Sequence, residues 1–77
     1  MNKQRRKVLR DICERLDAIR DEVEGVKDEE EAAYDNLPDG LRDGIKGTLM
    51  SENVDNLKDA IDGLEEVYDK IDTAAAE

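Results

Sequence analysis

The 77-residue sequence contains no histidine, tryptophan or phenylalanine, and only one cysteine, one proline and two tyrosines. Without histidine, the usual nucleophile–base pairs and histidine-containing zinc sites cannot form, and a single cysteine cannot form a disulfide within the chain. No apolar run approaches the ~18 residues that a membrane-spanning helix needs, and no apolar signal-peptide core follows the basic start. We therefore expect no enzyme, no metal or cofactor site and no membrane segment.

Basic charge is scarce and concentrated at one end. Five of the 12 basic residues lie in the first ten, and we call them the basic tip: Lys3, Arg5, Arg6, Lys7 and Arg10. The other seven basic residues and all 22 acidic residues lie in residues 11–77, which therefore carry a net charge of −15. Such an acidic body repels nucleic acid and anionic membranes, and it is attracted to basic protein surfaces. We expect no direct binding to duplex nucleic acid, although the tip could contact phosphate or could simply be a solvated helix start.

Apolar residues recur at alternating steps of three and four in two long runs. The first run is Leu9, Ile12, Leu16, Ile19, Val23 and Val26. The second run is Met50, Val54, Leu57, Ile61, Leu64, Tyr68, Ile71 and Ala75. These steps are typical of coiled-coil heptads, with Leu9 and Val54 at a positions, whereas strands would alternate every second residue. The pattern predicts an all-α protein.

A break separates the two runs. Pro38 disfavours helix at the residue before it, Asp39-Gly40 is a turn dipeptide, and Asp43 is a plausible cap for a second helix. We expect a helix over about 3–36, a turn over about 37–43, and a helix over about 44–75 with a short C-terminal tail. A short link between long helices makes them antiparallel neighbours, so the predicted fold is a single-domain, coiled-coil-like helical hairpin.

The register of this hairpin can be predicted from the stripes. Pairing residues whose numbers add to 80 matches the two runs completely and centres the hairpin on residue 40, inside the predicted turn. The pairs are Leu9–Ile71, Ile12–Tyr68, Leu16–Leu64, Ile19–Ile61, Val23–Leu57 and Val26–Val54. Towards the turn, Glu30 faces Met50 and Ala33 faces Gly47. Glycine disfavours helix by about 1 kcal/mol relative to alanine, so we expect the turn end to be the softer end.

The apolar stripe of the second helix is wider than one seam requires. Four further apolar residues at g positions are predicted on one side of the hairpin: Val8, Ala60, Val67 and Ala74. A widened stripe is typical of a bundle helix that contacts more than one neighbour. We therefore expect these residues to form an oligomer interface, most simply in a dimer that makes a four-helix bundle. A monomeric hairpin, or one that docks on a different protein, is the alternative.

The acidic residues of the sequence suggest two kinds of site. Asp28, Glu29 and Glu31 belong to a run that is either a solvated acidic turn or part of a partner-binding surface, because consecutive helical residues point in different directions. Glu30 occupies a seam position, where it could pair with Lys46, set specificity or mark the end of the core. A calcium loop starting at Asp35 fails at its third and twelfth positions.

Three other side chains could have a role. Cys13, beside the seam, is expected to be a half-buried small apolar residue in a reducing compartment, with an intersubunit disulfide as the alternative. Tyr68 is expected in the core with its hydroxyl outward. Tyr34, one residue beyond the seam, is the tyrosine more available for a partner.

Some stretches of the sequence resemble a known family. They are Met1-Asn-Lys-Gln-Arg-Arg-Lys7, Asp28-Glu-Glu-Glu-Ala-Ala-Tyr-Asp-Asn-Leu-Pro38, Met50-Ser-Glu-Asn-Val-Asp-Asn-Leu57 and Asp59-Ala-Ile-Asp62. They are similar to a family of small acidic helical proteins from bacteriophages and integrative elements of Gram-positive bacteria, although residues 40–45 are less polar than that pattern. The resemblance implies a mobile-element origin and the cytoplasm of a bacterial host, and it implies no activity.

Three hypotheses for function follow. The first is a non-enzymatic, self-associating interaction protein. In its sharpest form it is an acidic mimic of nucleic acid that inhibits a host defence system by occupying a basic groove of a host protein, as some anti-CRISPR and antirestriction proteins do. The second is an oligomer that sequesters a nucleotide signal with Arg5, Arg6 and Arg10. The third is a structural or assembly scaffold.

Overall fold

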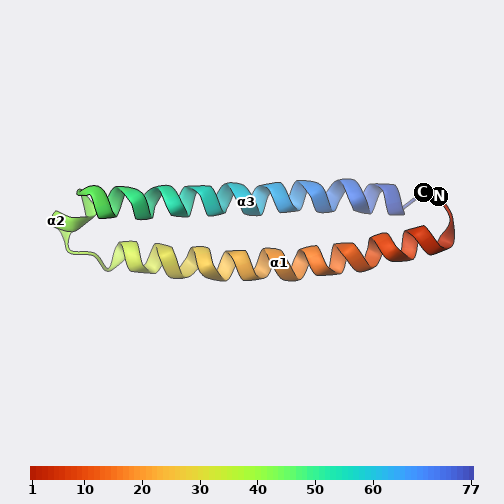
Figure 1. Cartoon of the computed structure of the whole chain (residues 1–77), viewed down its shortest axis with the longest axis horizontal. Helices are drawn as coiled ribbons and strands as arrows, with labels where there is room; N and C mark the ends of the chain where they lie inside the picture. The colour runs from red at the N-terminus through yellow and green to blue at the C-terminus, as the bar shows by residue number, and fades with distance from the viewer.

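The computed structural model describes all 77 residues and is a helical hairpin (Figure 1). The long helices α1 (Lys3–Asp35) and α3 (Ile45–Ala75) lie antiparallel, with the short helix α2 (Asp39–Arg42) between them. The rod measures 58 × 15 × 12 Å, and both termini lie at the end opposite α2. The predicted all-α hairpin is confirmed, and each long helix lies within one residue of its predicted bounds.

Local sequence signals account for the bounds of α1. Asn2 is its N-cap, and the Asn2 side-chain oxygen accepts a hydrogen bond from the backbone N–H of Arg5 at 2.8 Å. At the other end, the helix stops at Asp35, and the N–H of its C-cap, Asn36, bonds back to the carbonyl of Ala32 at 3.0 Å. Pro38 follows two residues later, where it cannot continue the α1 ladder.

The turn differs from its prediction in two respects. Within the predicted turn, residues 39–42 form one turn of helix that was not predicted, with Pro38 at its N-cap, where a missing N–H is harmless. Asp43 was predicted to cap the second long helix, but it is the C-cap of α2, and α3 begins after Gly44 with no side-chain cap. That prediction was wrong because the extra turn of helix moves the start of α3 one residue along the chain.

Gly47 is where α2 and α3 meet. It is buried, and a Cβ built on it would overlap the carbonyl of Arg42 and lie 2.7 Å from the Arg42 Cα. The backbone of α2 therefore crosses α3 at a distance that only glycine permits. Gly47 therefore permits a close contact as well as disfavouring helix, and the softness of the turn end stays a prediction.

The seam between α1 and α3 agrees with its prediction on α3 but differs from it on α1. The residues of α3 that are buried or half-buried include every member of the predicted stripe, from Met50 to Ala75. On α1, however, the buried row runs through Cys13, Arg20, Lys27 and Tyr34 together with the predicted Leu9, Leu16 and Val23. The predicted seam residues Ile19 and Val26 are instead 45% and 56% exposed.

A rotation of α1 about its own axis explains this difference. The predicted pair was Ile12 with Tyr68, whereas the Sγ of Cys13 lies 3.9 Å from the Tyr68 carbonyl oxygen. The register along the rod is thus close to the prediction, but α1 presents its a and e rows to α3 instead of its a and d rows. Long side chains make this possible, because Arg and Lys bury their aliphatic stems while the charged ends reach solvent. The Lys27 side chain is only 16% exposed.

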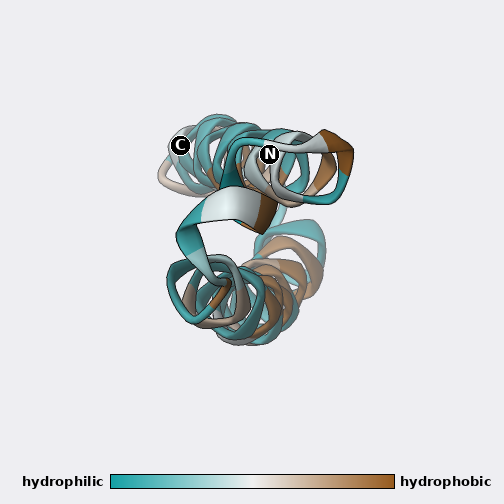
Figure 2. Cartoon of the chain, turned by 90° about the vertical axis from the view of Figure 1, so that its left-hand side faces the viewer, coloured by the Kyte–Doolittle hydropathy of each residue, from teal (hydrophilic) through white to brown (hydrophobic).

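The resulting core is small. Only four of 77 residues are buried, and three of them are Cys13, Val54 and Ala75. Viewed from the α2 end, the two long helices lie side by side with nothing covering either flank of the rod (Figure 2). The fold therefore leaves two long open faces on which function could depend.

Candidate interaction surfaces

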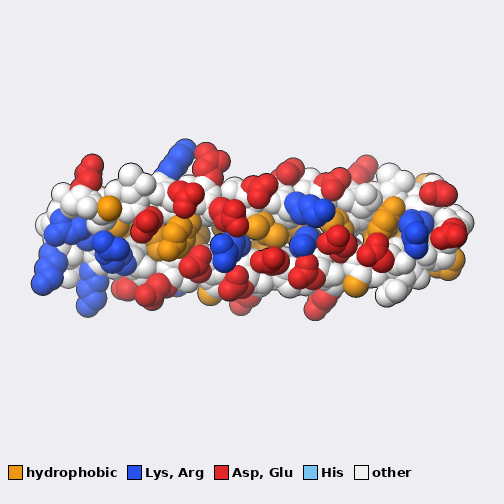
Figure 3. Space-filling view, turned by 180° about the vertical axis from the view of Figure 1, so that it is seen from behind, with side chains coloured by type: hydrophobic (Ala, Val, Ile, Leu, Met, Phe, Trp, Pro, Cys, Tyr) orange, Lys and Arg blue, Asp and Glu red, His pale blue; other side chains and the backbone are white.

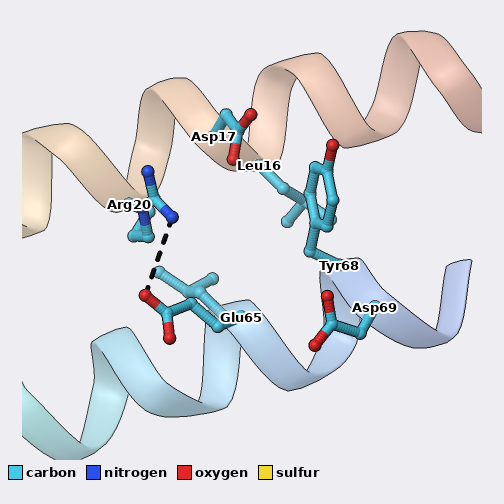
Figure 4. Close-up of a pocket in the computed structure, with 7 residues that line it drawn as sticks. Leu16, Asp17, Arg20, Glu65, Tyr68 and Asp69 are labelled. Atoms are coloured by element: carbon cyan, nitrogen blue, oxygen red, sulfur yellow. Dashed lines mark ion pairs between the residues drawn. The ribbon is translucent and has the colours of Figure 1, made fainter. Parts of the chain in front are cut away.

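A shallow hollow of about 310 Å³ lies halfway along the rod, between α1 and α3 (Figure 4). Leu16 and Leu64 form its apolar part, and Arg20 reaches across it to Glu65, with 3.6 Å between Nη1 and Oε1. Tyr68 extends from α3 towards α1 beside Asp17. The negative charge of Asp17, followed by burial, raises the pKa of the Tyr68 hydroxyl, and the hydrogen bond that Arg20 donates to the Asp21 carboxylate raises the pKa of Arg20. Both groups stay protonated near neutral pH, so they supply proton donors and no base.

The predicted acidic run is partly neutralised from within α1. The Lys27 ammonium lies 2.7 Å from the Asp28 carboxylate and 3.6 Å from that of Glu31. The hydrogen bond to Asp28 is the main cause of the raised Lys27 pKa. Glu29 is exposed and unpaired, and the half-buried Glu30 accepts a hydrogen bond from Asn53 at 3.3 Å, not from Lys46. The structure therefore separates the run into paired residues and one free carboxylate.

The basic tip lies against the end of α3. Arg6 donates to the Glu77 carbonyl oxygen at 2.6 Å, and Arg10 donates to that of Ala75 at 3.4 Å. Positive charge at the start of α1 opposes the dipole of that helix, but here it meets the negative end of α3, where carbonyls lack partners. This pairing accounts for an ordered basic start to the chain.

A basic groove of about 720 Å³ runs along the same end. It is lined by Lys3, Gln4, Arg6, Lys7 and Arg10. Arg5 does not line it, so the structure brings together two of the three arginines predicted to hold a nucleotide, and both already bind carbonyls of the C-terminal residues.

Arg42 is the functional side chain that sequence reasoning missed. Its guanidinium donates to the carbonyls of Asp35 and Leu37 at 2.8 and 3.1 Å, so it caps the end of α1 from α2. It also lies 5.8 Å from the centre of the Tyr34 ring, within the range of a cation–π contact. Tyr34 is half-buried on the seam rather than beyond it, so it is less available to a partner than predicted. The only feature of the sequence that could have indicated this capping role is an arginine four residues after Pro38.

One flank of the rod carries three of the six large exposed apolar side chains of the long helices, Ile19, Val26 and Val67. Each apolar residue on it stands one position before a seam residue, and one residue turns a helix by about 100°. Because the helices are antiparallel, this step turns α1 and α3 to the same side of the rod. We call this side the apolar flank: Ile12, Ile19 and Val26 of α1 with Ala60, Val67 and Ala74 of α3.

The apolar flank overlaps the predicted oligomer interface without matching it. Ala60, Val67 and Ala74 belong to both, and Val67 is 46% exposed. Val8, also predicted at this interface, is 45% exposed and lies farther round α1, at the outer edge of the flank. The rotation of α1 that moved Val8 away also brought Ile19 and Val26 onto this face.

The acidic surface covers the rest of the rod. Only six of the 22 carboxylates lie in ion pairs with a basic side chain. Figure 3 shows one face, where a broken row of apolar side chains runs between the helices, bordered by carboxylates, with basic side chains gathered at the end that holds the termini. The charge asymmetry of the sequence is thus also a spatial one.

Cys13 has no partner for redox or nucleophilic chemistry. It is buried, and burial raises the pKa of its thiol, with Asp72 and Asp17 adding to the effect. Buried, protonated thiols are poor nucleophiles. No group of three or more acidic or cysteine side chains is arranged to hold a metal ion, and no helix combines the length and apolarity of a membrane span. Comparisons of the chain with protein-family models, curated proteins and solved structures find no match.

Proposed function

We propose that this chain is a non-enzymatic helical interaction protein, encoded by a bacteriophage or another mobile element, that self-associates and binds a basic host protein. The observation that carries the proposal is the mismatch between a small core and a large open surface. Four of 77 residues are buried, while Ile19, Val26 and Val67 stay about half exposed on one flank. Exposed apolar surface of this extent, rimmed by charge, is typical of a protein–protein interface. Two hairpins stacked on this flank would make a four-helix bundle.

The charge of the rod supports the second half of the proposal. The whole chain carries a net charge of −10 along a rod 58 Å long, or about one net negative charge per 6 Å. A single nucleic-acid strand carries one phosphate per ~3.4 Å. The rod is less densely charged than such a strand, but its negative charge still attracts it to a basic groove that normally takes nucleic acid, and a host defence protein with such a groove would be inhibited by it.

The experiment is capture of basic proteins from a bacterial lysate by the tagged chain, followed by elution in rising salt. The test variant neutralises five exposed, unpaired carboxylates by amide substitution at Glu14, Glu24, Asp55, Asp59 and Asp62. We expect a captured nucleic-acid-binding protein to elute at lower salt from the variant than from the wild type, because fewer charges are engaged.

A matched control removes exposed, unpaired charges of the other sign. Replacing Lys46 and Lys58 with glutamine should leave capture unchanged or slightly stronger. The captured protein must also lose its nucleic acid when the chain is added. Capture that does not depend on the carboxylates, or a captured protein that keeps its nucleic acid, contradicts the mimicry.

The basic groove supports a second candidate, the sequestering of a nucleotide signal. Lys3 and Lys7 line the groove with no ion pair of their own, and lysine binds phosphate as a point charge. Cyclic and linear nucleotides should then raise the melting temperature, and Lys3→Ala with Lys7→Ala should abolish that rise. The corresponding change of Arg5 and Arg6 tests the arginines named from the sequence. A protein that responds to neither nucleotides nor basic proteins, and copurifies with other proteins of its element, is a scaffold.

A further inference from the structure

The side of α1 that carries the apolar flank has opposite charges on its two halves. Two rows of residues lie on this side of α1. The heptad d positions are Arg5, Ile12, Ile19, Val26 and Ala33, and the g positions beside them are Val8, Arg15, Glu22 and Glu29. All of these residues are exposed except Ile12, which is half-buried. The half before Ile19 carries Arg5 and Arg15, and the half after it carries Glu22 and Glu29. None of these four charged side chains forms an ion pair within the chain.

We infer that a second copy of this chain docks antiparallel on the apolar flank, about a two-fold axis that passes beside Ile19. Such an axis lies in the interface at right angles to the rod, so α1 stacks on α1 of the second copy and α3 on its α3. This inference rests on the proposed self-association and adds its geometry.

The spacing on α1 fits this axis. Ile12 and Val26 are each seven residues from Ile19, so in the antiparallel pair each meets the other while Ile19 meets its own copy. Arg15 and Glu22 are also nearly equidistant from Ile19, and Arg15 of each copy meets Glu22 of the other. A parallel stack of α1 on α1 would instead oppose like charges, which destabilises an interface.

The spacing on α3 fits the same axis independently. Arg20 and Glu65 are in contact, and both border the hollow that Leu16 and Leu64 line, so Ile19 lies level with residues 63–64. An axis at that level lies midway between Ala60 and Val67. In the dimer, Ala60 of each copy would therefore face Val67 of the other copy, so that a small side chain packs against a larger one at two places.

The size of the side of the rod that carries the flank also suits a dimer. That whole side measures 58 by 15 Å and offers about 900 Å² per copy, and specific protein interfaces of standard size bury on the order of 800 Å² per partner. The interface would pair apolar residues at its centre and charged residues at its rim, as such interfaces do.

The test is sedimentation equilibrium of the full chain, with circular dichroism to confirm that each variant stays helical. Ile19→Asp should weaken the dimer at least about 30-fold, because two carboxylates would meet at the axis. Ile45→Asp is the matched control, since Ile45 is 83% exposed and lies outside the flank. Arg15→Glu and Glu22→Arg should each weaken the dimer about tenfold, and the double variant should recover wild-type affinity.

Cross-linking fixes the direction of the two copies. In a Cys13→Ala background, Ile19→Cys should cross-link to its own copy with a short bismaleimide. Ile12→Cys should not, since its two copies would lie about 21 Å apart along the rod, at 1.5 Å per residue. A mixture of Ile12→Cys and Val26→Cys chains should cross-link.

The outcomes separate this inference from the proposal beneath it. A wild-type chain that is monomeric at every concentration overturns both. A dimer that tolerates Ile19→Asp, that the double charge exchange fails to restore, or in which Ile12→Cys cross-links to itself overturns the antiparallel geometry and leaves self-association standing.

Discussion

Replacing glycine with alanine should have opposite effects at different glycines of the long helices. Gly25 in α1 and Gly63 in α3 have open space where a Cβ would stand, whereas a Cβ on Gly47 would meet the backbone of Arg42. At the two open positions, alanine should stabilise the fold by ~0.5–1 kcal/mol, because glycine loses more backbone freedom when a helix forms.

At Gly47 the same gain is offset by a collision. The Cβ would lie 2.7 Å from the Arg42 Cα, whereas carbon atoms in contact prefer about 3.5–4.0 Å. The backbone of α2 must therefore move by about 1 Å, since backbone cannot swing aside as a side-chain end can. Overpacking of this kind costs ~1–3 kcal/mol, and the upper part of that range applies to backbone. We expect Gly47→Ala to lower the free energy of unfolding by about 1–2 kcal/mol in net.

Thermal unfolding by circular dichroism, at one fixed protein concentration, measures the difference. For a domain of 60–100 residues, 1 kcal/mol shifts Tm by about 4–8 °C. Gly47→Ala should therefore melt about 4–16 °C below the wild type, and Gly25→Ala should melt above it. Backbone amide hydrogen exchange should also become faster in residues 39–48, because α2 loses its close packing against α3 at Gly47. If Gly47→Ala raises Tm as the other two substitutions do, the close crossing of α2 over α3 is refuted.

Three further predictions concern the two ends and the seam. Arg42→Ala should lower the free energy of unfolding by about 1–3 kcal/mol in urea titrations, because the carbonyls at the end of α1 lose charged donors; an unchanged midpoint would contradict that capping role. Arg6→Ala should speed amide exchange in residues 72–77, whereas Arg5→Ala, whose guanidinium makes no hydrogen bond, should not; equal effects would contradict the pairing of the basic tip with α3. Folding raises the pKa of Cys13 above 9.0 and the pKa of Tyr68 above 10.0. At pH values just above 9.0 and 10.0, the folded chain therefore keeps protons that the unfolded chain has released. Stability should then be full below pH 9 and fall as pH rises above it, and Cys13→Ala with Tyr68→Phe should lessen that fall in urea titrations between pH 8 and pH 10.5; an undiminished fall would assign it to other groups.

The sequence by itself determined the hairpin. Two heptad stripes, an asparagine cap and one proline set the helices, their bounds and their antiparallel packing, because each of these signals acts over a few residues. The stripe of α3 also identified its buried face correctly.

Only the tertiary structure decided which rows of α1 meet α3. Hydrophobicity ranks Ile19 and Val26 above Arg20 and Lys27 for burial, yet the longer side chains lie in the seam. Their stems pack there while their charges reach Glu65 and Asp28, which are partners that no local pattern specifies. The same is true of Gly47, whose role depends on where the backbone of α2 passes. Helix periodicity identifies an apolar stripe that is wider than one seam. The packing of the two whole helices then determines which part of the stripe is buried and which part stays exposed for a partner.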